Sequence, residues 1–161
     1  MKTDYQLTPS GEYAYRYPRP SMTADAAVAC READGWWVLL IRRGHEPYQG
    51  RWAFPGGFMN MDETTAQCAR RELEEETALA LSTDPLFVGL FDSVDRDPRG
   101  RVITAAYLFI VDQRYEVRGG DDAKEARWWR TDDLPDLAFD HKEMMLKISA
   151  MLKTRDNETD R

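Results

Sequence analysis

The pattern of apolar and polar positions divides the chain into short strand-like runs and two helical segments. Two apolar runs, at residues 26–30 and 36–41, flank the turn Ala33-Asp34-Gly35, and an Asp-Gly pair between such runs predicts a β-hairpin. A loop rich in Gly and Pro follows, and then a short predicted strand at residues 51–54. The remaining apolar runs predict three further strands, at residues 86–93, 102–111 and 126–130.

The clearest predicted helix covers residues 63–79. Its apolar stripe, which we expect to pack on the core, comprises Ala66, Ala69 and Leu73. The opposite stripe, which we expect to face water, comprises Gln67, Arg70 and Glu74. A second amphipathic helix is predicted at about residues 141–153, with one apolar side formed by Met144, Met145, Ile148 and Leu152.

The order of these elements predicts the fold class. Strands bracket the first helix and the second helix closes the chain, which is typical of an α/β (α+β) protein with a mixed sheet packed between helices. A parallel pair of strands in that sheet requires the 63–79 helix as a crossover. The length fits one domain over residues 1–161, and a hydrophobic fraction of 42% excludes a disordered chain. Residues 1–20, rich in Tyr and Pro, predict an irregular or edge-strand lead-in, and the polar residues 154–161 predict a disordered tail.

The net charge, the apolar runs and the cysteines limit the possible partners and the cellular compartment. A formal net charge of −7 at pH 7 argues against nucleic acid as a partner. No apolar run approaches the ~18 residues needed to span a bilayer, and the N-terminus lacks the apolar core of a secretion signal, so we expect a cytoplasmic protein without a membrane partner. Cys30 and Cys68 lack metal-ligand spacing and are expected to be reduced thiols. A small phosphorylated substrate is compatible with the acidic charge, because a bound cation reverses the local sign of a site.

Carboxylates crowd the end of the first predicted helix. Glu72, Glu75 and Glu76 are related by i, i+3 and i+4, so they share one face, where like charges repel one another. Glu74 lies on the solvent-facing stripe and does not belong to this carboxylate ridge. Hard divalent cations prefer oxygen ligands, so the ridge of three carboxylates predicts a Mg²⁺ or Mn²⁺ site.

The frame around this ridge resembles the Nudix box. The positions that agree with the box are Gly57, Glu63, Arg71, Glu72, Leu73, Glu75, Glu76 and Leu79. One position departs from the box, since Ala78 stands where the second Gly is usual. Either Ala78 adopts the left-handed cap less favourably than Gly, or the helix continues through Leu79. The chain is identified by this resemblance as a member of the Nudix hydrolase superfamily, which implies a Nudix-type α/β/α sandwich.

The resemblance implies a metal site and a reaction. Glu72, Glu75 and Glu76 match the metal-binding carboxylates of the family, the backbone carbonyl of Gly56 matches a further ligand, and Glu75 is also assigned to catalysis. The family reaction is the hydrolysis of a nucleoside diphosphate linked to another group, with Mg²⁺ or Mn²⁺ as the cofactor.

Two other roles follow from the resemblance. Glu63 and Arg71 match a structural charge pair within the box. Many members carry a general-base Glu in a loop after the box, and here residues 119–125 form that loop, with Glu125 as the first candidate and Asp122 as the second. The alternative for either residue is a solvated acidic loop without a catalytic role.

The substrate is suggested by two further stretches. Residues 93–101 and 48–52 look like segments of ADP-ribose pyrophosphatase-like members, so we predict a substrate site formed by Arg51, Trp52, Arg96 and Arg99. Residues 95–101 could instead form a self-satisfied surface turn, and Trp52 could pack under the helix. The favoured reaction converts ADP-ribose to AMP and ribose 5-phosphate. The alternatives are pyrophosphohydrolysis of (d)NTPs, dinucleotides or sugar-nucleotides, and non-catalytic binding of an ADP-ribose-type ligand. The N-terminal Tyr- and Pro-rich segment could contribute to a homodimer interface.

Overall fold

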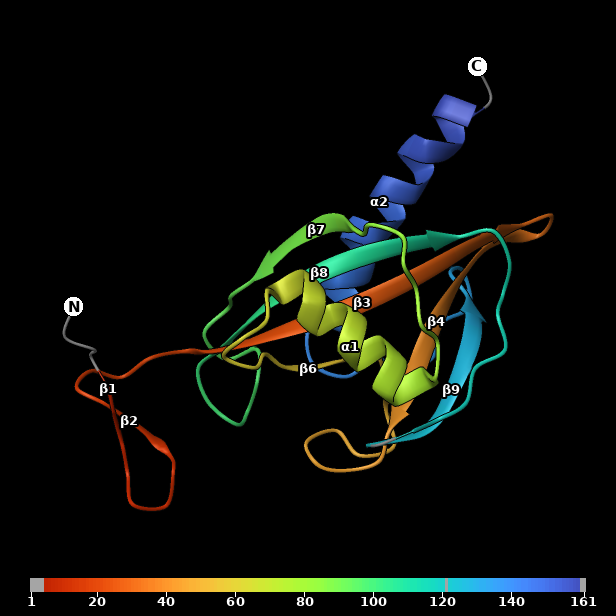
Figure 1. The fold of residues 1–161 in the computed structure, drawn as a ribbon. Helices are drawn as coiled ribbons and strands as arrows, with labels where there is room; N and C mark the ends of the chain where they lie inside the picture. Colours follow the sequence, from red (N-terminus) through yellow and green to blue (C-terminus); the bar gives the residue numbers. More distant parts are fainter. Residues whose placement is uncertain (1–4, 121, 160–161) are drawn as a thin grey trace.

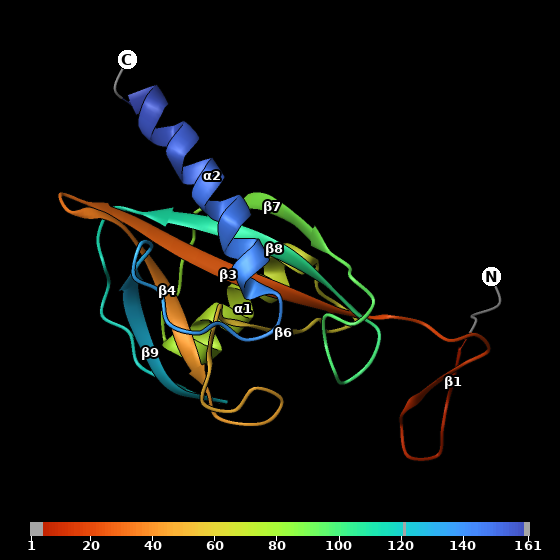
Figure 2. The ribbon, with the colours of Figure 1, turned by 180° about the vertical axis from the view of Figure 1, so that it is seen from behind.

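The computed structural model describes residues 5–120 and 122–159 as a mixed β-sheet with one helix on each face and a small separate hairpin (Figures 1 and 2). The strands of the hairpin are β1 (Tyr5–Leu7) and β2 (Tyr13–Tyr15). The strands of the sheet are β3 (Ser21–Glu32), β4 (Gly35–Arg43), β5 (Trp52–Ala53), β6 (Gly56–Phe58), β7 (Leu86–Phe91), β8 (Val102–Val111) and β9 (Ala123–Arg130). The helices are α1 (Thr65–Thr77) and α2 (His141–Thr159).

The sheet combines parallel and antiparallel pairs, as the sequence predicted. Its strand order is β5-β4-β3-β8-β7, with β6 also paired to β3 and β9 to β4. Strands β3 and β8 run parallel, from the pair Ser21–Val102 to the pair Cys30–Val111. The other pairings in this sheet are antiparallel. Helix α1 lies in the crossover between β3 and β8, so the requirement that a parallel pair imposes is met.

Side chains of the central strands alternate between two buried layers. Val28, Leu39 and Phe109 pack with Leu73 under α1. The intervening positions, such as Leu40 and Leu108, pack with α2 residues including Ile148 and Leu152. This period of two along each strand is what divides the core between the two faces of the sheet. The layers confirm the predicted sandwich with a mixed sheet between helices.

The ends of α1 are defined by its caps. Thr64 is the N-cap and forms a capping box with Gln67, so the helix begins two residues later than predicted. At the other end Ala78 adopts a left-handed conformation, with φ of 59°, and its N–H donates to the Glu74 carbonyl at 2.8 Å. The first of the two alternatives for Ala78 is therefore correct, and the continued helix is wrong. A residue with a Cβ is disfavoured there by about 1 kcal/mol relative to Gly.

Three expectations outside the sheet need correction. Arg70, expected to face water, is half-buried and its guanidinium lies 5.5 Å from the centre of the Phe109 ring. Within the lead-in, which was expected to be irregular or an edge strand, residues 5–15 form the separate β1–β2 hairpin, in which the ring centres of Tyr5 and Tyr13 lie 5.1 Å apart. Helix α2 does not stop near residue 153, and residues 154–159 of the predicted tail are helical.

Contacts with the body of the protein explain the length of α2. Asp156 accepts hydrogen bonds from the indole N–H of Trp36, at 3.0 and 3.1 Å, and also pairs with Arg31. These contacts hold the last turns of the helix, which composition alone could not indicate. Neither described helix has the length and apolar character that crossing a bilayer requires.

Candidate active site

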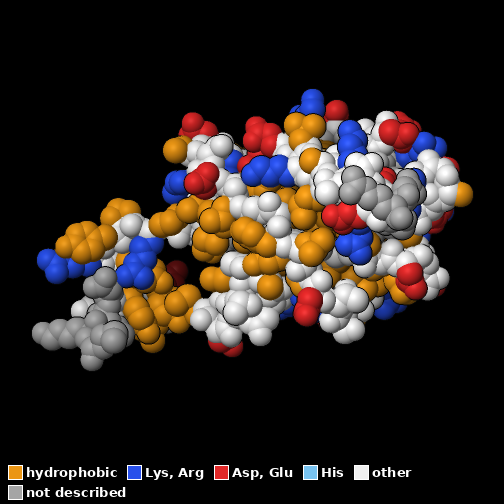
Figure 3. Space-filling model, turned by 90° about the horizontal axis from the view of Figure 1, so that it is seen from above, with side chains coloured by type: hydrophobic (Ala, Val, Ile, Leu, Met, Phe, Trp, Pro, Cys, Tyr) orange, Lys and Arg blue, Asp and Glu red, His pale blue; other side chains and the backbone are white. Residues whose placement is uncertain are grey.

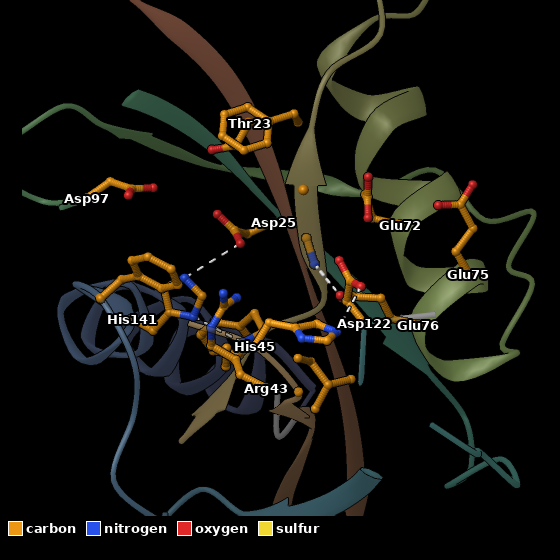
Figure 4. Close-up of a pocket in the computed structure, with 18 of the residues that line it drawn as sticks. Thr23, Asp25, Arg43, His45, Glu72, Glu75, Glu76, Asp97, Asp122 and His141 are labelled. Carbon is orange, nitrogen blue, oxygen red and sulfur yellow. Dashed lines mark hydrogen bonds and ion pairs between the residues drawn. The ribbon is translucent and has the colours of Figure 1, made fainter. Parts of the chain in front are cut away.

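A cavity of about 430 Å³ opens between α1, the first half of β3 and the start of α2 (Figure 4). The residues around it come from segments far apart in the sequence, including the 53–58 stretch, the loop at 96–99 and residues 139–141. One wall is acidic, and the opposite wall carries arginines and phenylalanines. The cavity therefore brings together the two kinds of group that a metal–diphosphate complex needs.

The acidic wall is the carboxylate ridge. Glu72, Glu75 and Glu76 all line the cavity, as predicted, whereas Glu74 is exposed elsewhere on α1. Glu76 is buried, and one of its oxygens accepts the N–H of Gly56 at 3.0 Å. Burial, together with the nearby carboxylates Glu72 and Asp25, raises the pKa of Glu76 to about 8, against a lowering by the Gly56 hydrogen bond.

Arg71 holds the ridge in place. Its guanidinium donates to Glu63 at 2.6 and 3.0 Å, to Glu72 at 2.6 Å and to Glu75 at 3.0 Å. The hydrogen bonds from Arg71 lower the pKa of the Glu63 carboxyl to about 2. A further bond runs to the Phe58 carbonyl, so Arg71 ties the helix to the preceding strand. The contact predicted between Glu63 and Arg71 is present.

Two glycines allow the chain to approach the ridge closely. A Cβ on Gly57 would lie 2.5 Å from the Glu72 carboxyl carbon, and a Cβ on Gly56 would lie 2.3 Å from an Asp25 oxygen. Any other residue at either position would have to displace these side chains. Close packing therefore explains the Gly-Gly pair, which the resemblance to the Nudix box also implies.

The donor set fits a hard divalent cation. It consists of three carboxylates and a backbone carbonyl, the oxygen ligands that Mg²⁺ and Mn²⁺ prefer. Among the described residues, no three His, Cys, Asp or Glu side chains already converge as a cluster that could hold an ion. Glu72 and Glu75 are instead held by Arg71. To bind an ion in the cavity, these two carboxylates would have to turn away from Arg71.

Arginines form the opposite wall. Arg99 pairs with the buried Asp97 at 2.7 Å, and its guanidinium lies 4.8 Å from the centre of the Phe58 ring. Arg43 donates to the Pro47 carbonyl at 2.7 Å and lies 4.9 Å from the Phe139 ring. Both line the cavity, where guanidinium donors suit phosphate oxygens.

Arg96 also borders the cavity but is held differently. It is buried and forms a bidentate pair with Asp140, at 2.7 and 2.8 Å. Its predicted contact with substrate therefore competes with a pair that joins the 93–101 loop to the start of α2. Asp97 likewise accepts the backbone N–H of Arg99, so much of this loop is a self-satisfied turn, as the alternative proposed.

The other predicted residues divide between the cavity and its surroundings. Among the described residues that line the cavity, Asp122 is present and Glu125 is not. Glu125 is exposed on β9, opposite Arg42. Arg51 is exposed beside Tyr48, and Trp52 packs edge-on against Trp129 at 5.1 Å, within the layer under α2. Trp52 therefore packs against the core, as the alternative expected, but it does so under α2 and not under the predicted 63–79 helix.

Residues that sequence reasoning missed complete the site. Asp25 is buried on β3 and accepts a hydrogen bond from the Thr104 hydroxyl. A signal for it existed, because a lone carboxylate within an apolar strand needs a partner. His141, predicted only to start a helix, does start α2 and is also buried against the cavity. Arg43 and Phe139 carried no comparable signal.

The cysteines take no part in this chemistry. Cys30 and Cys68 are both free and buried. Burial, reinforced by Glu63, raises the pKa of the Cys68 thiol to about 12. A thiol that stays protonated is a poor nucleophile.

Comparison with known proteins adds an independent line of evidence. A family model described as the NUDIX domain matches residues 20–148. An ADP-ribose pyrophosphatase from Methanocaldococcus jannaschii is 40% identical over 129 residues, which is 80% of this chain and 73% of that enzyme. The ADPR responsive transcriptional repressor NtrR of Acinetobacter baylyi is 30% identical over 89% of this chain and 58% of the repressor.

Solved structures give the same picture of the fold. The NUDIX domain of Shewanella oneidensis NrtR, crystallised with ADP ribose, superposes with a TM-score of 0.78 at 26% identity, over 84% of this chain and 90% of that domain. A MutT/nudix family protein from Enterococcus faecalis superposes with a TM-score of 0.76 at 32% identity, over 86% of this chain and 64% of that protein.

Proposed function

The chain belongs to the Nudix family, whose domain model spans residues 20–148, and from this premise we propose that it hydrolyses ADP-ribose to AMP and ribose 5-phosphate with a divalent cation. The observation that carries the proposal is the cavity itself, in which the carboxylate ridge faces Arg43 and Arg99. An acidic wall for the cation opposite a cationic wall for phosphate suits a diphosphate. The similarity to the M. jannaschii ADP-ribose pyrophosphatase supports the choice of substrate.

Each wall has its own task in the proposed reaction. The proposed ligands of the cation are the Gly56 carbonyl and the carboxylate ridge. A bound Mg²⁺ or Mn²⁺ supplies charge neutralisation of the diphosphate and an attacking water of lowered pKa. Arg43 and Arg99 orient the phosphate oxygens through their N–H donors, and for Arg99 this contact competes with its pair to Asp97. Since the leaving group is a phosphate, positioning and electrostatics account for most of the proposed rate enhancement.

We place Asp122 ahead of Glu125 as the general base. Asp122 lines the cavity and lies 3.5 Å from the His45 imidazole, whereas Glu125 points from the exposed side of β9. A base has to reach the attacking water directly or through one further water. Asp122 meets this requirement better than Glu125, because it lies at the cavity.

A panel assay tests the proposed function. Purified protein with Mg²⁺ is incubated with ADP-ribose, NADH, a diadenosine polyphosphate and dNTPs, and the products are separated by ion-exchange chromatography. We expect AMP and ribose 5-phosphate from ADP-ribose at the highest kcat/KM. Glu76→Gln, with an unchanged circular dichroism spectrum, is expected to lose at least ~10²-fold in turnover. Release of pyrophosphate from a dNTP at a higher kcat/KM would favour the triphosphatase alternative.

A second candidate is binding of ADP-ribose without turnover. It is favoured by the similarity to the A. baylyi repressor and by Arg71, which pairs with two carboxylates of the ridge. Isothermal titration with ADP-ribose in EDTA separates the two functions, when combined with the product assay. Tight binding with no AMP formed after Mg²⁺ is added would support the binding module.

We also propose that the protein is cytoplasmic and homodimeric. Two free buried thiols support a reducing compartment. An isolated two-stranded hairpin is marginal in water, yet the β1–β2 hairpin projects from the body with exposed Leu7 and Tyr13, and apolar side chains also gather on the upper face of the body (Figure 3). Light scattering of the full chain and of a variant lacking residues 1–17 tests the dimer. A monomeric full-length protein would exclude it.

A further inference from the structure

His141 lies where three segments of the chain meet beside the cavity. It is the first residue of α2 and is fully enclosed. Its Nδ1 accepts the backbone N–H of Phe54 at 3.1 Å, and its Nε2 lies 3.6 Å from an oxygen of Asp25 on β3 (Figure 4). One imidazole therefore contacts both the stretch that leads into the Nudix box and the strand that pairs with it.

The hydrogen bond to Phe54 defines the state of the ring. An imidazole nitrogen that accepts an N–H carries no proton, so the proton of the neutral ring sits on Nε2 and points toward Asp25. Burial lowers the pKa of His141 and keeps this neutral form at pH 7. The neutral ring therefore has a defined orientation, with Nδ1 as acceptor toward Phe54 and Nε2–H as donor toward Asp25.

The contacts continue from His141 to the carboxylate ridge. Asp25 is held on its other oxygen by Thr104, and it stands opposite Gly56 in the β3–β6 pair. The Gly56 backbone packs directly on the Asp25 carboxylate, and the Gly56 N–H donates to Glu76 at 3.0 Å. His141 therefore holds the chain on both sides of Pro55, through Phe54 on one side and through Asp25 and Gly56 on the other.

We propose that His141 is a positioning residue for the cation site, which holds the 54–56 segment so that the Gly56 carbonyl and the Glu76 carboxylate serve the same ion. His141 contacts neither ion nor substrate in this role and acts through Phe54 and Asp25. The inference rests on the proposed function only for its kinetic consequence, since cation binding can be measured without a substrate. Groups that hold metal ligands in place commonly change metal affinity by ~10–100-fold when removed.

The competing interpretation is a buried histidine that only stabilises the fold. Under that interpretation, removing the ring would lower the melting temperature and leave the affinity of the folded protein for a cation unchanged. Met144, one turn further along α2 and fully buried in the core, provides a matched control. Met144→Ala removes a large side chain from the same helix, and Met144 is not among the described residues that line the cavity.

The test compares Mn²⁺ binding by electron paramagnetic resonance in wild type, His141→Leu, His141→Asn and Met144→Ala, with melting temperatures recorded in EDTA. The Asn amide oxygen can still accept the Phe54 N–H, whereas Leu cannot. We expect the Mn²⁺ dissociation constant to rise at least ~10-fold in His141→Leu and about threefold in His141→Asn. Met144→Ala should melt lower and bind Mn²⁺ as wild type does.

Two results would overturn the proposal. One is wild-type Mn²⁺ affinity in both His141 variants, and the other is an equal loss of affinity in Met144→Ala. A kinetic split provides a second measurement, because the Mg²⁺ concentration for half-maximal turnover should rise in His141→Asn while the KM for ADP-ribose stays constant. A wild-type protein that binds Mn²⁺ and leaves ADP-ribose intact would refute the proposed function alone, and the Mn²⁺ comparison would still decide the role of His141.

Discussion

The protonation of Glu76 makes the stability of the metal-free protein depend on pH in a predictable direction. The pKa of this carboxyl is raised from 4.5 to about 8 in the folded state, a difference worth about 5 kcal/mol at ~1.36 kcal/mol per pKa unit. A raised pKa means that the folded state binds the proton more tightly than the unfolded state. The stabilisation is therefore complete below pH 4.5 and is lost as the pH rises through 8.

Glu76→Gln removes this titration while keeping the shape of the side chain. Both proteins would be unfolded with urea in EDTA at pH 5, 7 and 9, with tryptophan fluorescence as the signal. We expect the wild type to lose up to about 5 kcal/mol relative to Glu76→Gln between pH 5 and pH 9. Mg²⁺ should restore the stability of the wild type at pH 9, and its binding at pH 7 should release about one proton. A difference between the two proteins that stays constant within ~1 kcal/mol across this range would refute the reasoning.

Three further predictions concern the box and the general base. Ala78→Gly should raise the free energy of unfolding by about 1 kcal/mol in urea titrations, because Gly adopts the left-handed cap freely, and a loss of stability would contradict the cap. Glu63→Gln should lower the free energy of unfolding by about 2 kcal/mol at pH 7, after allowance for solvent screening. This loss should disappear as the pH falls from 4.5 toward 2, because the pKa of Glu63 is lowered to about 2 in the folded protein. A loss that persists at pH 2 would argue against the pair with Arg71. Asp122→Asn should reduce kcat by at least ~10²-fold and Glu125→Gln by less than ~3-fold, and the reverse order would reinstate Glu125 as the base.

Sequence reasoning worked best where the relevant spacing is local. The carboxylate ridge depends on the i, i+3 and i+4 geometry of one helix, and Glu72, Glu75 and Glu76 do meet at one cavity. The pair Glu63 and Arg71 likewise lies within one segment. Short-range geometry of this kind is present in the order of the residues themselves.

The remaining features depend on contacts between distant segments. Trp52 was a candidate for substrate binding, but its contact with Trp129 of β9 determines the face of the sheet on which it packs. His141 acquires its role only when α2 docks beside Phe54 and Asp25. The last turns of α2 persist because Asp156 meets Trp36. None of these partners is within reach of a periodicity argument.

The parallel pair at the centre of the sheet has a consequence for how the protein folds. Strand β3 is bonded along ten residues to β8, and the whole segment that contains β4, the box and β7 lies between them. Pairing of this kind has a high contact order, so its loop-closure entropy must be overcome before the contacts can compensate for it. While the chain is being synthesised, β3 cannot pair with β8 along its whole length until residue 111 has left the ribosome. Asp25 lies in the part of β3 that pairs with β8, so the wall of the cavity to which it belongs is also completed late in folding.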